Sequence, residues 1–310
     1  MRVASRIKQA LASIGYYRGC LARAPYHGVA VLTYHAVRGG ATADRAMQFG
    51  PLHVTATRFE SHCAVLRDLG CSFLSLAEWH GIATGSLRVP FSPVMLTFDD
   101  GYRSVLTEAL PILERFGIPA LVFVCTGPVD RGERFWYDAL AEREGEAAVA
   151  AAKAGAFALW RESAARTAMP AFAGDPHAPL GVDELRQLAG HPLITIGAHT
   201  VSHPILARAS PVVQAKEVGG AKTMLEGWIG RRVDAFAYPN GWPGADYDER
   251  TIGIVRDCGF THAFTTAERF AVPSEAALEH PRFTMLQDIT AFELAHRLAI
   301  TWPRVEALIS

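Results

Sequence analysis

The chain has 310 residues and half of them are hydrophobic, so it can bury one large core, and α/β barrels of this size fold as one unit. Its 30 basic and 31 acidic residues nearly cancel, which gives no indication of a nucleic-acid partner. The five cysteines include no pair at CxxC spacing. We therefore expect reduced thiols, without a disulfide framework or a thiolate metal site, as in a cytoplasmic protein.

Residues 1–27 predict a basic amphipathic helix, because Val3, Ile7, Leu11 and Ile14 recur on one helical face. Two roles are open for this helix: it closes the bottom of a barrel, which we favour, or it lies on an anionic membrane surface. No run of 18 apolar residues occurs, and the N-terminus lacks the apolar core of a signal peptide. The expected location is cytoplasmic, with peripheral contact at the inner membrane surface as the alternative.

Apolar strands alternate with helical patterns over residues 28–300. Strands are predicted at 28–34, 72–76, 94–98, 120–125, 193–196, 235–238, 263–265 and 282–285. Helical patterns fall at 58–69, 105–116, 210–229, 251–258 and 291–298. This alternation predicts parallel βαβ units, and the expected fold class is α/β, an irregular (β/α) barrel with about seven strands.

An alanine-rich stretch interrupts this alternation at about residues 130–190 and has helical propensity. We expect it to be an insertion that caps or flanks the barrel. The predicted organisation is therefore an N-terminal helix over 1–27, a single domain over 28–300 that contains this insertion, and a short tail over 301–310.

Polar residues follow several predicted strands, and the carboxyl ends of parallel barrel strands meet at one rim. These residues are His35, Asp99, Asp100, His199, Asn240 and Arg282. Adjacent carboxylates at 99 and 100 would raise each other's pKa unless a positive group lies between them. His199 and His203 would share one face of a helical turn, and two neutral imidazoles with one carboxylate make an open catalytic metal site. On its own, such a histidine pair would be read as two surface residues. With the two aspartates, it predicts a divalent metal at this rim.

Three motifs carry a resemblance to a known family: TFDDG at 97–101, HTVSHP at 199–204 and, more loosely, AYPNG at 237–241. Their types and order resemble the polysaccharide deacetylase family, the NodB-homology or carbohydrate esterase family 4 proteins. The opening strand, LTYHAV at 32–37, is similar to one branch of that family. The resemblance covers about residues 28–300 and implies the NodB-like deacetylase barrel.

The resemblance also implies a division of roles among the motif residues. The metal, zinc by expectation with Co²⁺, Ni²⁺ and Mn²⁺ left open, would be bound by Asp100, His199 and His203. Asp99 would stay off the metal and act as general base, kept ionised by the cation. The backbone N–H of Asn240 would donate to the oxyanion, and Gly241 would let the backbone turn close to substrate.

The sequence departs from the family pattern at two points. The family's third motif often begins with an arginine that holds the base aspartate, but Ala237 stands there. We expect Arg282 to supply the guanidinium from another position. The family's last motif often gives a general-acid histidine in a Leu-x-His context, which is not found. His35 and His280 are the candidates, and a strand-end histidine that only bonds a neighbouring loop is the alternative for His35.

Aromatic and turn residues near these motifs are candidates for substrate contact. Aromatic faces stack on sugar rings, so Trp136 and Trp242 are predicted subsite walls, with simple packing as the alternative. Tyr34 is expected on the pocket floor or inside the barrel. The remaining predicted substrate residues are Tyr238, Pro239 and Gly241.

The function predicted from the sequence is a metal-dependent hydrolase that removes N-acetyl or related N-acyl groups. Its expected partner is an amino-sugar glycan or a glycolipid precursor, with no nucleic acid. Two alternatives are open: a catalytically silent carbohydrate-binding or assembly protein on the same barrel, and an O-acetyl esterase, whose better leaving group needs a general acid less.

Overall fold

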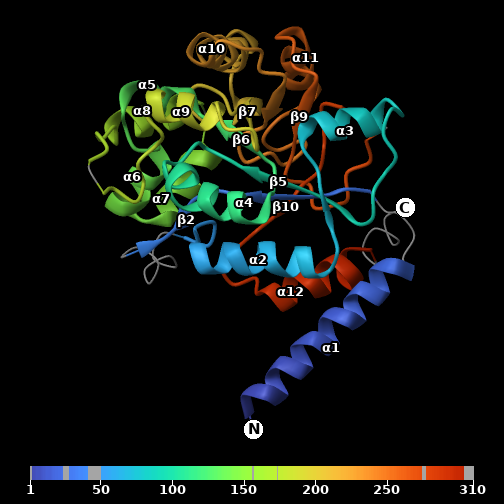
Figure 1. Cartoon of the computed structure of the whole chain (residues 1–310). Coiled ribbons are helices and arrows are strands. Elements are labelled where there is room, and N and C mark those ends of the chain that lie inside the picture. The colour runs from blue at the N-terminus through green and yellow to red at the C-terminus, as the bar shows by residue number, and fades with distance from the viewer. Residues whose placement is uncertain are drawn as a thin grey trace.

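The computed structural model describes residues 2–23, 28–40, 50–155, 157–172, 174–273 and 277–303, with side chains described in these ranges except at 2–12 and 157–159. Within them, a parallel sheet curls into an irregular barrel with helices on its outer face (Figure 1). Its strands are β1 (Ala30–Tyr34), β4 (Ser72–Phe73), β5 (Pro93–Phe98), β6 (Ala120–Val124), β7 (Ile194–Ala198), β8 (Ala235–Ala237), β9 (His262–Phe264) and β10 (Phe283–Thr284). The predicted α/β barrel is confirmed.

The strand order is β10–β1–β5–β6–β7–β8–β9, and β4 adds an eighth strand by pairing with β5. The two ends of this order approach each other, because Phe264 forms a parallel bridge with His280 just before β10. Every ladder of the sheet is parallel, so the carboxyl ends of its strands lie at one rim. A small separate sheet pairs β2 (Val37–Arg38) with β3 (Val54–Thr55).

Helices cover the outside of the barrel (Figure 1). Those that follow the strands are α2 (Ala56–Asp68), α3 (Leu76–Ala83), α4 (Leu110–Phe116), α10 (Pro211–Ile229), α11 (Glu249–Asp257) and α12 (Ala291–His296). The segment between β6 and β7 contains α5 (Thr126–Arg131), α6 (Trp136–Glu144), α7 (Glu146–Ala154), α8 (Phe157–Arg166) and α9 (Val182–Ala189). The alanine-rich stretch therefore lies in a helical segment between two neighbouring strands.

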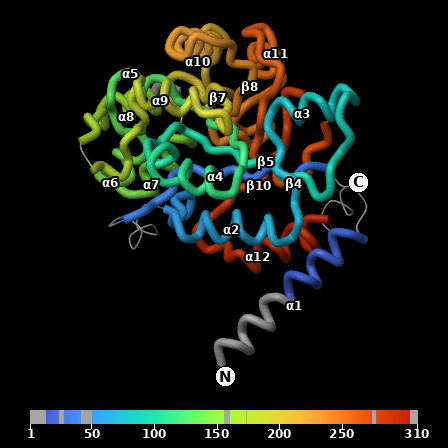
Figure 2. Tube along the Cα trace, viewed as in Figure 1, coloured from blue at the N-terminus to red at the C-terminus, as the bar shows by residue number. Residues whose placement is uncertain are grey.

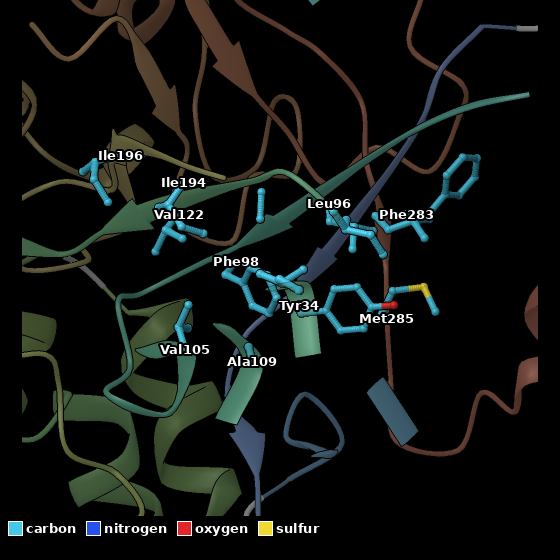
Figure 3. Close-up of a cluster of buried hydrophobic side chains, with 14 of the residues drawn as sticks. Tyr34, Leu96, Phe98, Val105, Ala109, Val122, Ile194, Ile196, Phe283 and Met285 are labelled. Carbon is cyan, nitrogen blue, oxygen red and sulfur yellow. The ribbon is translucent and has the colours of Figure 1, made fainter. Parts of the chain in front are cut away.

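Alternation along the strands divides the core into two layers. Leu32 and Leu96 belong to the cluster between sheet and helices, part of which Figure 3 shows. Val31 and Met95 belong to a second cluster, inside the barrel. Each of these side chains is almost fully buried, which stabilises the fold by roughly 1.5–3 kcal/mol per large apolar side chain. The alternation decides which polar residues at the strand ends point inward.

Helix α3 was not predicted from the sequence, which gave a strand over 72–76. The strand ends at Phe73 because Ser75 begins the helix. The Ser75 side chain accepts from the backbone N–H of Glu78, and the Glu78 carboxylate accepts from the backbone N–H of Ser75 at 2.8 Å. This reciprocal capping box satisfies two N–H groups at the helix start, which outweighs the strand pattern.

Helix α1 (Arg2–Arg23) and α12 lie side by side although they come from opposite ends of the chain (Figure 2). Ile14, Tyr17 and Leu21 pack against the main core, and the Tyr17 hydroxyl lies 3.4 Å from Nδ1 of His296. The predicted membrane-facing surface depends on the side chains of residues 2–12, which lie outside the part of the chain whose side chains the structure describes. Among the described helices, none is long and apolar enough to cross a membrane.

The predicted C-terminal tail begins too early. Trp302 is buried and stacks on Phe283 of β10, with ring centroids 3.7 Å apart. The chain therefore contributes to the core at this point, while residues 304–310 lie outside the described part.

Candidate active site

A tight turn after β5 separates the two aspartates. Asp99 continues the alternation of the strand, whereas Asp100 has φ 74° and Gly101 has φ 90°. A side chain at 101 would be strained, because the backbone is left-handed there and a Cβ would lie 3.1 Å from Cγ1 of Val124. Non-glycine residues in this region cost roughly 1–3 kcal/mol each and gather at functional sites. Besides Asp100, those at this rim are Thr200, His203 and Asn240.

The histidine motif is a loop after β7, so the predicted helical turn is wrong. Its backbone is left-handed at Thr200 and His203, which a helix would not allow. Glu217 of α10 holds the loop, because its carboxylate accepts from the N–H groups of Val201 and Ser202 at 3.0 and 2.8 Å. This clamp was not predicted from the sequence. The histidines meet through loop geometry rather than helical spacing.

Asp100, His199 and His203 converge on one point. Nε2 of His199 lies 3.5 Å from Oδ1 of Asp100, and Nε2 of His203 lies 3.6 Å from the same oxygen. Two ligand atoms about 2.0–2.1 Å from a tetrahedral zinc lie roughly 3.3 Å apart, so the spacing suits such an ion. All three side chains are buried. They form one of the groups that could hold a metal within the described residues.

The surroundings of these three side chains also fit a metal. Burial lowers the pKa of His199 and of His203, so both imidazoles are neutral and can act as ligands. Nδ1 of His199 lies 2.8 Å from the carbonyl oxygen of Ala237, to which it can donate while Nε2 keeps its lone pair. Oδ1 of Asp100 is buried and has no hydrogen-bond partner in the described part of the chain. Burial and the neighbouring Asp99 raise the pKa of Asp100, an effect that a bound cation would reverse.

Arg282 occupies the barrel interior and pairs with Asp99. Its Nη1 and Nη2 donate to Oδ1 and Oδ2 of Asp99 at 2.7 and 2.8 Å. Further donations go to the hydroxyls of Thr33 and Thr97 and to the carbonyl oxygen of Thr265. The inward-facing Ala237 is small and belongs to the same interior. A guanidinium therefore reaches the aspartate from the residue just before β10 rather than from β8.

Asp99 is kept ionised by this pairing. Burial alone would raise its pKa, but the charge and hydrogen bonds of Arg282 and the nearby His199 outweigh burial and lower the pKa to about 2. Asp99 and Asp100 thus have opposite pKa shifts although they are adjacent. Such a separation assigns different roles to two neighbouring carboxylates.

A pocket of about 230 Å³ opens at these residues. It is lined by His35, Leu52, Asp99, Asp100, Tyr137, Lys153, His199, His203, Asn240, Thr266 and Thr284. Pockets that enclose a drug-sized ligand hold roughly 300–1,000 Å³, so this one suits a group about the size of a single sugar unit, with the rest of a longer ligand outside.

Of the turn motif at 237–241, Asn240 reaches the pocket and its neighbours shape the turn. The N–H of Gly241 donates to the carbonyl oxygen of Pro239 at 2.7 Å, and Gly241 has φ 79°. Trp242 is 56% exposed beside this turn. Its predicted role as a substrate-contacting wall remains a prediction.

Two predicted pocket residues point away from the pocket. Tyr34 pairs with Phe98 across β1 and β5, and both side chains lie in the sheet–helix layer (Figure 3). The Tyr34 hydroxyl is 3.1 Å from Nδ1 of His62. Tyr238 is 1% exposed and stacks on Tyr247 with ring centroids 3.9 Å apart. The prediction that these tyrosines contact substrate is wrong, because the strand alternation that sends Asp99 inward sends them outward.

His280 lies at the opposite end of the barrel, so the prediction that it is a general acid is wrong. It is buried beside Trp79, and its Nε2 is 3.2 Å from Nδ1 of His262, the first residue of β9. Burial and the neighbouring His262 lower its pKa to about 3. Of the two candidate acids, only His35 lines the pocket.

The insertion contributes Tyr137 and Lys153 to the pocket, and neither was predicted from the sequence. The Tyr137 ring packs edge-on against His203, with centroids 5.0 Å apart. The predicted subsite wall Trp136 instead packs against Trp160 within the insertion and donates from Nε1 to the carbonyl oxygen of His203 at 3.4 Å. Trp136 therefore supports the loop that carries His203 and does not face the pocket. Three consecutive aromatic residues, Phe135, Trp136 and Tyr137, mark this region in the sequence, but only the helical phase of α6 decides which ring points into the pocket.

A second buried group of ligand-type residues contains His53, Asp138 and His177. Arg38 donates to Nδ1 of His53, from Nε at 3.2 Å and Nη2 at 2.6 Å. A guanidinium can only donate, so this nitrogen has no lone pair for a metal and the ring proton lies on Nε2. Asp138 is held by the Tyr102 hydroxyl at 2.6 Å and by Nδ1 of His177 at 3.1 Å. We expect this group to form a hydrogen-bonded network without a cation.

The chain belongs to the polysaccharide deacetylase family, whose sequence pattern matches residues 87–263. It is 22% identical over 236 residues to YxkH of Bacillus subtilis (strain 168), covering 76% of this chain and 63% of that protein. It is also 33% identical over 125 residues to the poly-beta-1,6-N-acetyl-D-glucosamine N-deacetylase of Escherichia coli (strain K12), covering 39% of this chain and 18% of that protein. The chain thus spans less than two thirds of the length of either relative.

The fold is shared with solved structures. The Streptococcus pyogenes deacetylase PplD, solved in complex with acetate, has a TM-score of 0.64 at 22% identity, covering 89% of this chain and 99% of that chain. IcaB from Ammonifex degensii has a TM-score of 0.63 at 21% identity, covering 88% of this chain and 98% of that chain. These similarities support the barrel described above.

Proposed function

We propose that this chain is a metal-dependent hydrolase that removes N-acetyl or related N-acyl groups from an amino-sugar glycan or glycolipid precursor. The observation that carries the proposal is one pocket in which an ionised Asp99 lies beside the convergent set Asp100, His199 and His203. Family membership and the relative that acts on poly-N-acetylglucosamine agree with it.

Asp100, His199 and His203 would hold the cation, for which the donor set suits zinc, with Co²⁺, Ni²⁺ and Mn²⁺ as alternatives. A cation bound there would polarise the acyl carbonyl and lower the pKa of water. Asp99, fixed by Arg282, accepts a proton from the attacking water. The backbone N–H of Asn240, a residue that lines the pocket, would donate to the developing oxyanion. His35 passes a proton to the leaving nitrogen.

His35 is neutral near pH 7, because burial lowers its pKa to about 4. It must therefore gain a proton during the reaction before it protonates the leaving amine, and the source is the proton that Asp99 takes from the attacking water. We expect His35→Gln to lower kcat on an N-acetyl substrate by roughly 10²–10⁴-fold with little change in KM. An O-acetyl ester should lose much less, because its alkoxide leaves more readily. An equal loss on both substrates would contradict the acid role.

A paired assay tests the proposed reaction against the two alternatives. Zinc-loaded protein is incubated with a tetramer of N-acetylglucosamine and with an O-acetylated xylan oligomer, and acetate is measured with and without a chelator. The proposal expects chelator-sensitive release from the N-acetyl tetramer. Release from the ester alone would favour an esterase, and full metal occupancy without release from either would favour a silent binding protein.

Cytoplasmic location and contact of α1 with an anionic membrane surface remain predictions from the sequence. The helix carries Arg2, Arg6 and Lys8 in its first turns. Such a basic segment would bring the pocket close to a membrane-bound glycolipid. Vesicle co-sedimentation with and without anionic lipid measures this contact.

A further inference from the structure

Lys153 reaches the pocket from α7 in the insertion. Its Nζ donates to Oδ1 of Asn240 at 3.1 Å and lies 5.6 Å from the centroid of the Tyr137 ring. It lines the same pocket as Asp99 and Asp100. An ammonium carries three donors, so the contact with Asn240 leaves two for other partners.

No carboxylate in the described part of the chain forms an ion pair with Lys153 within 4.0 Å. The acidic groups that face it from farther away are Asp100, Asp246, Glu146 and Asp138. Arg282, in contrast, lies in the barrel interior and is fully paired with Asp99, which lines the pocket. Lys153 is half-buried, and an ammonium that loses part of its hydration is costly to leave without a charged partner. A group that arrives with the ligand would supply the missing partner.

The charged groups of the pocket itself favour an anionic partner, whereas Asp246, Glu146 and Asp138 lie outside its lining. The charges of Asp99 and Arg282 cancel each other. The carboxylate of Asp100 would offset one of the two charges of a bound divalent cation, which leaves one positive charge. Lys153 adds a second positive charge to the loaded pocket. Lysine is a compact point charge without the fixed fork of arginine, so it can accept either a carboxylate or a phosphate.

We infer that Lys153 binds an anionic group of the substrate, a carboxylate or a phosphate ester, on the sugar that is deacylated or on its neighbour. The preferred substrate is then an acidic amino-sugar glycan or a phosphorylated amino sugar. The small pocket places this anion within about one sugar unit of the acyl group. This inference rests on the proposed function for the same pocket.

Two matched substrate pairs test the inference. The carboxylate pair is a tetrasaccharide that alternates N-acetylglucosamine with glucuronate, and the same compound with its carboxylates reduced to alcohols. The phosphate pair is N-acetylglucosamine 1-phosphate and N-acetylglucosamine. With zinc-loaded protein, we expect the anionic member of one pair to have a kcat/KM at least about tenfold higher, as a hydrogen-bonded charge pair would give. The pair that shows this preference identifies the anion.

Variants of Lys153 distinguish binding of the substrate anion from a purely structural contact with Asn240. Lys153→Met should bring the preference close to one, mainly through a higher KM of the anionic member. Lys153→Arg should retain most of the preference. Lys216→Met, which removes an exposed charge on α10, should retain all of it. A preference that survives Lys153→Met, or no preference in the unmodified protein, would overturn the inference. So would an equal fall of kcat on both members, which would mean that Lys153 only holds Asn240.

Acetate release also separates this inference from the proposed function. If no compound releases acetate, the proposed deacylation fails. The preference is then measured as a ratio of dissociation constants by calorimetry with the same compounds and variants. A ratio that favours the anion and is lost in Lys153→Met would still support recognition by Lys153, whereas a ratio near one would refute it.

Discussion

Asp100→Asn is expected to lose the bound metal, whereas Asp99→Asn is expected to keep it and lose turnover. Asp100 shares the convergence point with His199 and His203, while both oxygens of Asp99 are bound by Arg282. Loss of a general base lowers kcat by roughly 10²–10⁴-fold. Metal content by mass spectrometry and acetate release, measured on the same preparations, check both results.

Asp138→Asn is the matched control for this pair of variants. Asp138 belongs to the second ligand-type group, where Arg38 donates to His53, so its loss should leave metal content unchanged. Thermal melting of each variant shows whether the protein is folded before activities are compared. Equal loss of metal from Asp99→Asn and Asp100→Asn would contradict the division of roles.

Arg282→Met is expected to destabilise the protein by roughly 3–5 kcal/mol, because it leaves the buried Asp99 carboxylate unpaired. In the unmodified protein, Asp99 has a pKa of about 2, below its ordinary value. Its contribution to stability is therefore fully present at pH values above the ordinary pKa of a carboxyl group, and it is lost as the pH falls through about 2. Without Arg282, burial is uncompensated and the pKa of Asp99 rises. The acidic limb of activity should therefore move to higher pH, and stability near neutral pH should fall.

A double variant isolates the pair. Arg282→Met combined with Asp99→Asn removes both charges, and it should be more stable than Arg282→Met alone although it is inactive. Denaturant unfolding of the four proteins in the cycle measures the coupling. A coupling free energy near zero would mean that Arg282 stabilises the barrel without acting on Asp99.

The fold and the motif residues of the site, Asp99, Asp100, His199 and His203, were predictable because each leaves a local signal in the sequence. Apolar strands alternating with helices predict the parallel barrel, and the polar residues after those strands gather at its rim. Arg282 could be proposed as the partner of Asp99 because it stands at the start of another predicted strand, while Ala237 occupies the place of the arginine expected in the third motif. The helical insertion followed from composition alone.

The remaining features depend on register and on contacts distant in sequence. Tyr34 was placed in the pocket wrongly. The side of the sheet on which its side chain lies depends on the register with Phe98 of the neighbouring strand, and the sequence of one strand does not reveal that register. The loop that carries His203 takes its shape from Glu217 and from left-handed backbone, not from spacing. Lys153 enters the pocket only through the packing of α7, and an alanine-rich helix carries no signal for it.

Zinc titration of chelator-treated protein, followed by acetate release from the N-acetylglucosamine tetramer, tests the central claim most directly. The claim is that one metal held by Asp100, His199 and His203 serves a hydrolase with Asp99 as base. Activity should rise in proportion to bound zinc and reach its maximum at one equivalent per chain. Acetate release that is independent of zinc, or one equivalent of bound zinc without release, would contradict it.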